Sequence, residues 1–274
     1  MAGVFYSRDP AELRQEIESC FLHKFGPKKL PEKTFSERKT LAVVCPHAGY
    51  AYSGPVASHA YFRLAQETAP EVVVILGPSH RGFDTPVAIM EKGEWNTPLG
   101  GIKVDEKLAK RIFEVSGLID IDEEAHRYEH SIEVQLPFLQ YIYGSSFKFV
   151  PICMSLQDLE ISRKIGADLG VALKDVNAVL IASSDLSHYV HQAVAEELDK
   201  LVINAALSLD ENKLNSYVLS RGITTCGYGP VSAILVASKM LGATKGELLS
   251  YRTSGDITGD YSAVVGYSSI AIVR

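Results

Sequence analysis

Four short apolar runs, rich in β-branched residues, recur along the chain and are separated by segments with helical periodicity. The runs occupy residues 41–45, 72–76, 147–153 and 178–182. The run 147–153 is weaker, because Lys148 and Pro151 interrupt it. Uninterrupted apolar runs of this length favour strands that are covered on both faces, as in a parallel sheet. The helical patterns that alternate with them occupy residues 56–69, 105–116, 131–143 and 158–173. This alternation predicts an α/β fold with a central, mostly parallel sheet flanked by helices.

The two ends of the chain add further elements to this pattern. Asp9-Pro10 supplies a capping carboxylate followed by a proline, which predicts that a helix begins at residue 10. Residues 28–39 are charged, so we expect a surface connection there. Near the C-terminus the sequence predicts helices over 193–208 and 231–241 and strands, as an antiparallel extension, over 247–252 and 263–273. No linker or repeat divides the chain, so we expect residues 1–274 to form a single domain.

Charge and cysteine usage exclude several functional classes. The 27 lysines and arginines are outnumbered by 33 acidic residues, which gives a formal net charge of −6 and argues against a nucleic-acid binder. The four cysteines form no CxxC pair and are too sparse for a disulfide scaffold. We find neither a leader-like start nor an apolar run of the ~20 residues that a membrane helix needs. We therefore expect a cytoplasmic protein without a membrane or nucleic-acid partner.

A histidine-bearing turn directly follows each of three of these apolar runs. The turns contain, in chain order, His47, His80 and the pair Asp185 and His188. Ligands bind outside the carboxyl ends of the strands in open α/β sheets, and parallel strands present those ends at one edge. We therefore expect these four side chains to converge on one site. Capping of strand ends or of loop carbonyls is the alternative for any single histidine.

Two histidines with one anionic side chain and open coordination positions form a ligand set that suits iron(II). His47 and His80 are the predicted imidazole pair. The third ligand has two candidates, the carboxylate of Asp185 and the thiolate of Cys226. Cys226 precedes a predicted helix start, where the helix dipole and free amides lower the pKa of a thiol. A small buried side chain is the alternative for this cysteine.

Residues 126–130 match H-x-x-E-H, a zinc-peptidase pattern in which two histidines share one face of a helix. The match makes a zinc hydrolase built on His126 and His130 an alternative function. Pro137 follows closely, however, and the helical pattern begins only after the motif. We therefore favour a substrate-contact or supporting role for Glu129, His130 and Glu133, with a purely structural cap as the other alternative.

Three further side chains are predicted to line the pocket. Tyr50 follows His47 closely, Arg81 is able to bind a carboxylate or phosphate in bidentate fashion, and Trp95 lies in a turn-rich stretch that could close over a substrate. An exposed surface position is the alternative for Arg81, and a loop anchor is the alternative for Trp95. No GxGxxG, Walker A or GxSxG motif is present, so nicotinamide, nucleotide-phosphate and serine-hydrolase functions lack support.

Six ordered motifs resemble the Memo family. They are PHAGYAYSGPVA, LGPSHRG, WNTPLG, EHSIEVQLPFL, SSDLSHY and GDYSAVVGYSSI, and they extend from about residue 41 to the C-terminus. Memo proteins are similar in fold to the class III extradiol dioxygenases, which use non-haem iron(II). The resemblance therefore implies a class III extradiol dioxygenase-like α/β fold with a metal pocket at one edge of the sheet.

The resemblance also implies a set of site residues and partners. The family's metal ligands, two histidines and a cysteine, match His47, His80 and Cys226, and the SSDLSHY segment places Asp185 and His188 in the same pocket. The dioxygenases have a glutamate where this family has the cysteine, and a thiolate changes the redox properties of a metal. Prokaryotic members often accompany a radical-SAM protein and an AMMECR1-like protein, which implies these two as pathway partners.

Together these observations predict a metal-dependent, dioxygenase-like oxidoreductase that acts on a small molecule. Iron(II) is the first expected metal, copper the second and zinc the third. His188, oriented by Asp185, would act as general base or proton donor. The alternative function is a non-enzymatic module that binds a peptide or a phosphorylated ligand in the same pocket.

Overall fold

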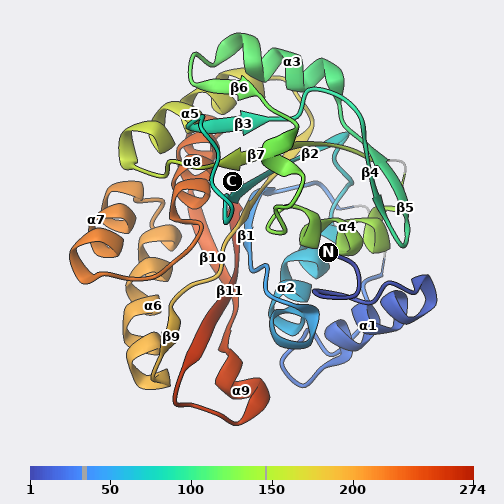
Figure 1. Cartoon of the computed structure of the whole chain (residues 1–274), viewed down its shortest axis with the longest axis vertical. Coiled ribbons are helices and arrows are strands. Elements are labelled where there is room, and N and C mark those ends of the chain that lie inside the picture. The colour runs from blue at the N-terminus through green and yellow to red at the C-terminus, as the bar shows by residue number, and fades with distance from the viewer. Residues whose placement is uncertain (33–35, 146) are drawn as a thin grey trace.

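The computed structural model describes residues 1–32, 36–145 and 147–274, and its central feature is a mixed sheet (Figure 1). The strands follow the order β10-β11-β1-β8-β2-β7-β3-β6, and β9 pairs with β11. Their bounds are β1 (Thr40–Cys45), β2 (Val72–Pro78), β3 (Val87–Ile89), β6 (Ile119–Ile121), β7 (Lys148–Met154), β8 (Ala178–Ser183), β9 (His188–Val190), β10 (Lys245–Thr253) and β11 (Val264–Val273). Strands β1, β8, β2 and β7 run parallel, whereas β11 is antiparallel to both β1 and β10. The predicted fold class and its antiparallel extension are confirmed.

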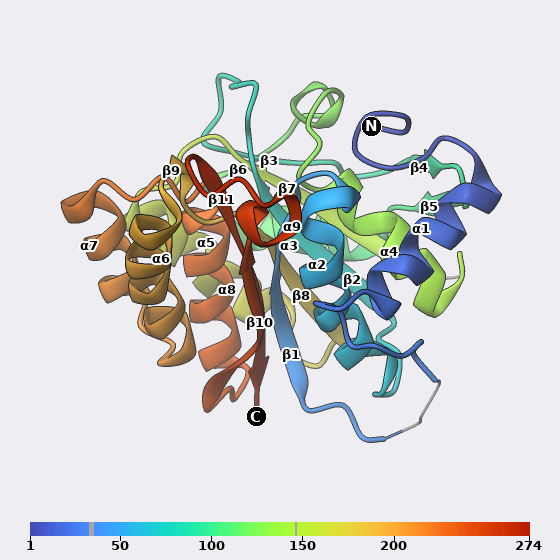
Figure 2. The ribbon, with the colours of Figure 1, turned by 90° about the horizontal axis from the view of Figure 1, so that it is seen from below.

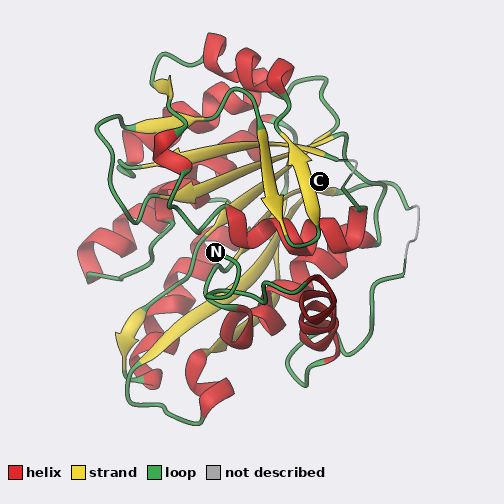
Figure 3. Ribbon diagram, turned by 45° about the vertical axis from the view of Figure 1, so that its right-hand side comes forward, coloured by secondary structure: helices red, strands yellow, loops and turns green. Residues whose placement is uncertain are grey.

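Helices cover both faces of the sheet and produce three layers (Figure 2). One face carries α5 (Leu159–Ala172), α6 (Gln192–Leu207), α7 (Glu211–Arg221) and α8 (Tyr228–Met240), and α8 packs against β8 and β1. The other face carries α1 (Pro10–Leu22), α2 (Tyr50–Ala65) and α4 (Leu136–Tyr143), and α2 packs against β1 and β11. Figure 3, with helices in red and strands in yellow, shows the sheet between its helices. The peripheral elements are α3 (Glu106–Val115), α9 (Ser254–Thr258), the 3-10 helices η1 (Glu124–His126) and η2 (Glu133–Gln135), and a hairpin of β4 (Glu94–Thr97) and β5 (Gly100–Lys103).

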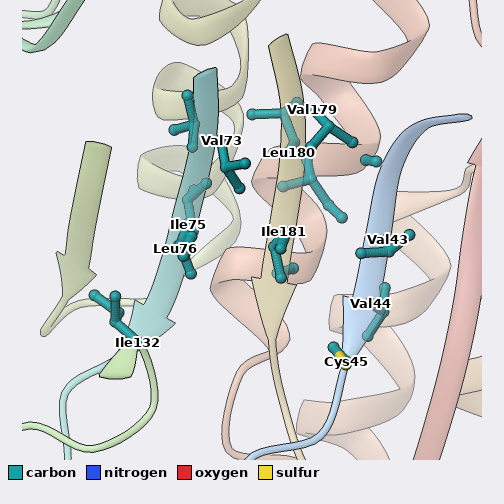
Figure 4. Packing of buried hydrophobic residues seen from close by; sticks show 14 of the residues in the cluster. Val43, Val44, Cys45, Val73, Ile75, Leu76, Ile132, Val179, Leu180 and Ile181 are labelled. Atoms are coloured by element: carbon teal, nitrogen blue, oxygen red, sulfur yellow. The ribbon is translucent and has the colours of Figure 1, made fainter. Parts of the chain in front are cut away.

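The central strands form the hydrophobic core. Every residue of β1 and β2 is buried, and β8 is buried from its second residue onward. Figure 4 shows Val43, Ile75 and Ile181 among the apolar side chains that these strands contribute. Because helices cover both faces of the sheet, the side chains on both faces of these strands are apolar. This explains why the strands are recognisable in the sequence as continuous apolar runs.

Helix α2 begins earlier than its periodicity predicts. It starts at Tyr50 rather than at residue 56, and it includes Pro55. Gly54 lies against α1, where a Cβ atom would collide with Sγ of Cys20. Gly54 therefore allows close packing between α1 and α2, and the Gly-Pro pair does not end helix α2, although this dipeptide is typical of a turn.

Several short elements were not predicted. Strands β3, β6 and β9 have three residues each, too few for a periodic signal. The expected surface connection over 28–39 includes residues 33–35, which lie outside the described residues. Within the described part of the chain, no helix is both long and apolar enough to cross a bilayer. The single-domain organisation stays a prediction.

Candidate metal centre

Three adjacent parallel strands end at the same edge of the sheet, and the turns that follow them meet there. Strand β8 lies between β1 and β2 and pairs with both. β1 leads into His47, β8 into Asp185 and β2 into His80. One nitrogen each of His47, His80 and His130 lies within 4.8 Å of the others. The structure therefore brings the predicted imidazole pair together, and His130 joins it from the segment between η1 and η2.

Hydrogen bonds fix the tautomer of His47. Its Nδ1 lies 2.9 Å from Oγ of Ser183. That hydroxyl already donates its proton to the carbonyl of Ser131 (2.6 Å) and accepts one from Nε2 of Gln135 (2.8 Å). The hydroxyl can therefore only accept from His47, so Nδ1 carries the ring proton and Nε2 presents a free lone pair. This is the arrangement that a metal-binding histidine requires.

A carboxylate fixes His80 in the same way. Oε1 of Glu129 accepts from Nδ1 of His80 at 2.9 Å, and the other oxygen accepts from the backbone N–H of His80 at 2.6 Å. Burial raises the pKa of Glu129, but the hydrogen bonds from His80 and from the backbone N–H of Ser131 lower it to about 2. Glu129 is therefore ionised at neutral pH, and Nε2 of His80 is left free for a cation.

The two more buried imidazoles are neutral. Burial lowers the pKa of His47 well below its usual value, and nearby His130 and His80 lower it further. Burial and His80 lower the pKa of His130 to about 4. The His130 ring also stacks on Phe5, with ring centroids 4.5 Å apart. Neutral imidazoles are the form in which histidine binds metals, so no protons need to leave these two rings first.

Cys226 lies beside the histidine cluster, directly before α8. Its Sγ is 3.2 Å from Nε2 of His47 and accepts a hydrogen bond from the backbone N–H of Asp185, also at 3.2 Å. Burial and the neighbouring Asp185 raise the pKa of the thiol. The expected lowering by the helix start is therefore not found, because desolvation is the larger effect. A metal ion at this position would displace the thiol proton.

Asp185 and His188 follow β8, but they are not hydrogen-bonded to each other. Oδ1 of Asp185 accepts from the backbone N–H of His47 at 2.8 Å, and burial raises the pKa of this carboxyl to about 6 against that hydrogen bond. The ring of His188 is oriented by Thr224, whose carbonyl lies 2.9 Å from Nδ1. The expectation that Asp185 orients His188 is thus wrong in its geometry. Because Nδ1 donates to Thr224, Nε2 of His188 is the free ring nitrogen.

The predicted substrate contacts lie in different places. Tyr50 is buried in the core, and its hydroxyl donates to the carbonyl of Val134 at 2.7 Å, which makes it part of the scaffold. Arg81 is exposed beside His80. Trp95 lies in β4 and lines a separate pocket of about 330 Å3 together with Met90, Glu94, Asn96, Glu123, Glu124, His126, Arg127 and Glu133.

The zinc-hydrolase alternative requires one helix that carries both histidines of the H-x-x-E-H motif. His126 instead ends the short helix η1, and its Nδ1 bonds the carbonyl of Asp122 at 2.9 Å. Its ring meets Trp95 edge to face. Only His130 of the pair belongs to the histidine cluster. The turn between η1 and η2 therefore separates the two side chains, and this alternative is not supported.

The supporting residues Ser183, Ser131, Gln135 and Thr224 were missed. Each acts through a hydrogen bond to another side chain or to the backbone, and their types are common in any loop. Ser183 alone carried a signal, because it is the polar end of a buried strand that leads into Asp185.

These features describe an α/β protein with a cluster of three histidines, able to hold a metal ion, at the carboxyl edge of its sheet. The family model described as Memo-like protein matches residues 1–271. The chain is 49% identical over 276 residues to MEMO1 family protein MK0963 of Methanopyrus kandleri, with 100% of this chain and 98% of that protein covered. It is 48% identical to MEMO1 family protein MJ0403 of Methanocaldococcus jannaschii, with 99% and 97% covered. The chain therefore belongs to the Memo family.

A solved structure supports the fold independently. Uncharacterized protein JW3007 from Escherichia coli K12 superimposes with a TM-score of 0.58 at 17% sequence identity, and the match covers 86% of this chain and 100% of that chain. At this identity the likeness concerns the fold alone.

Proposed function

We propose that this chain is a metal-dependent redox protein that binds one transition-metal ion between His47, His80 and a third ligand. The observation that carries the proposal is the convergence of three imidazole nitrogens within 4.8 Å. In two of these rings Nδ1 is already committed, to Ser183 and to Glu129, so both Nε2 atoms carry a lone pair for a metal; that of His47 lies 3.2 Å from Sγ of Cys226.

The third ligand is the thiolate of Cys226 or the imidazole of His130. Sγ of Cys226 lies close enough to His47 to share an ion with it, and His130 belongs to the same cluster. Imidazole and thiolate donors suit iron, copper and zinc, whereas calcium and magnesium prefer oxygen. We propose iron(II) as the metal, with copper second and zinc third. Bound iron or copper would supply the redox chemistry, whereas zinc would act only as a Lewis acid.

The surrounding residues would bind the substrate and move a proton. His47 is almost fully enclosed, whereas the side chains of His80 and His130 are 32% and 20% exposed, so a small molecule would approach from their side. Nε2 of His188 is the atom that would accept or deliver a proton, because its Nδ1 is held by Thr224. Asp185 would keep His47 in place through the backbone N–H.

Metal analysis of protein purified under anaerobic conditions tests the proposal. We expect about one iron per chain in the wild type and its loss in His47→Ala and His80→Ala. The matched control is His59→Ala, because this half-buried histidine also bonds a neighbour, the carbonyl of Phe25, but lies outside the cluster. A wild-type protein that binds neither iron nor copper would reject the redox proposal, and one that binds no zinc either would favour a binding module that works without metal.

A further inference from the structure

The closing motif GDYSAVVGYSSI and a buried carboxylate on α6 have no role in the site described so far. The carboxylate belongs to Asp199, whose side chain is completely enclosed. Its Oδ1 accepts both the backbone N–H of Ser187 (2.9 Å) and the hydroxyl of Ser187 (2.6 Å). Its Oδ2 accepts the hydroxyl of Tyr251 at 2.8 Å. Burying a carboxylate costs free energy unless its oxygens are fully hydrogen-bonded, so we ask what these hydrogen bonds of Asp199 achieve.

Ser187 is the residue to which Asp199 is most firmly bound, and it lies between two residues of the site. Asp185 precedes it by two positions and holds the backbone of His47. His188 follows it directly. The loop from 184 to 187 has no regular structure of its own and leads into β9 at His188, so its shape depends on bonds to other elements.

The closing motif holds the same loop from the other side. The backbone N–H of Gly266 donates to the carbonyl of Ser187 at 2.9 Å, and the carbonyl of Gly266 accepts from Leu186 at 2.8 Å. A Cβ atom at position 266 would collide with Oδ2 of Asp199. The glycine therefore lets strand β11 approach the carboxylate and the loop at the same time.

From these contacts we infer that Asp199 is a positioning residue for the metal centre. It acts through Ser187 to set the loop that carries Asp185 and His188, and Gly266 is the position that makes room for it. All three bonds to the carboxylate come from donors, so an acceptor is required there. The consequence for metal binding rests on the proposed function, but the effect on the loop does not.

The test compares Asp199→Ala, Asp199→Asn and Ser187→Ala with the wild type. Nitrogen-15 spectra of the imidazole rings in the metal-free protein report the environment of each histidine. We expect Asp199→Ala to move the signals of His188 and His47 and to leave His59 in place. Asp199→Asn keeps an acceptor for Ser187 and should restore the wild-type signals.

The control Tyr251→Phe removes the bond to Oδ2 and leaves both bonds to Ser187 intact. It should lower the melting temperature without moving the ring signals of His188. Titration with Co2+ then measures the consequence, and we expect Asp199→Ala to bind about tenfold more weakly, the lower end of the range for groups that orient ligands.

The results distinguish the two proposals. A wild type that binds no Co2+ contradicts metal binding, while the ring spectra still test the positioning role. If Asp199→Ala folds and leaves both ring signals and Co2+ affinity unchanged, Asp199 has no positioning role. If Asp199→Ala does not fold, unchanged ring signals in Ser187→Ala lead to the same conclusion, and a shift of the His188 signal in that variant supports the inference.

Discussion

The hydroxyl of Ser183 selects which nitrogen of His47 is free, and its removal makes a quantitative prediction. In Ser183→Ala, Nδ1 of His47 loses its acceptor and the carbonyl of Ser131 loses its donor. Each buried group left without a partner costs roughly 1–3 kcal/mol of stability. The ring can recover part of this cost by moving its proton to Nε2, which is the nitrogen that the metal needs.

We therefore expect two effects in Ser183→Ala. The free energy of unfolding of the metal-free protein falls by roughly 1–3 kcal/mol for each unpaired group, measured by urea denaturation. The affinity for Co2+ falls about 10–100-fold, measured by absorbance titration. The serine contributes no atom to the cluster of imidazole nitrogens, so this loss would come from orientation alone.

Ser58→Ala is the matched control. Ser58 is also fully buried, and its hydroxyl donates to the backbone carbonyl of Pro55 at 2.8 Å, but it lies in α2 away from the cluster. It should lose stability and keep its Co2+ affinity. Equal Co2+ affinities in the two variants would refute the argument that Ser183 sets the tautomer.

Three further predictions concern other contacts of the structure. Gly54→Ala should lower the free energy of unfolding by about 1–3 kcal/mol, because its new methyl group would overpack against Cys20, and Gly54→Ala with Cys20→Ala should recover part of the loss; no recovery in urea denaturation would contradict the packing argument. The pKa of Glu129 is lowered to about 2, so the ionised carboxylate stabilises the fold fully above pH 4.5, its ordinary pKa, and this stabilisation disappears as the pH falls through 2. The difference in free energy of unfolding between wild type and Glu129→Gln should therefore shrink from pH 4.5 to pH 2. A difference that stays constant over this pH range would contradict the lowered pKa. The pKa of the Cys226 thiol is raised, so metal binding through its sulfur must release a proton. The Co2+ affinity should therefore rise more steeply with pH in the wild type than in Cys226→Ser. Equal slopes in the two proteins would assign the third ligand to His130 instead.

The fold was predictable because its strands carry their own signal. Strands β1, β2 and β8 are covered on both faces, so almost every residue in them is apolar and the runs stand out. The same strands made His47 and His80 predictable, since parallel neighbours end at one edge. The start of α2 was not predictable, because Gly54 and Pro55 are typical of turns until the contact with Cys20 is known.

The supporting contacts of the site could not be predicted for a physical reason. Thr224 orients His188 and Ser183 orients His47, but the two residues of each pair are far apart in sequence and are joined only by hydrogen bonds. Such bonds depend on positions set by the whole sheet. The direction of the pKa shift of Cys226 was wrong for a related reason, because sequence shows the nearby helix start and does not show how completely the thiol is buried.

The parallel pairing of β1 with β8 also constrains how the protein is made on the ribosome. Val44 of β1 pairs with Ala182 of β8, so β1 leaves the ribosome long before the strand with which it pairs has been synthesised. During that interval the apolar strands β1 and β2 lack β8, the neighbour that lies between them in the finished sheet. We therefore expect the nascent chain to depend on chaperones until β8 has left the exit tunnel, and a chain truncated before that point to aggregate.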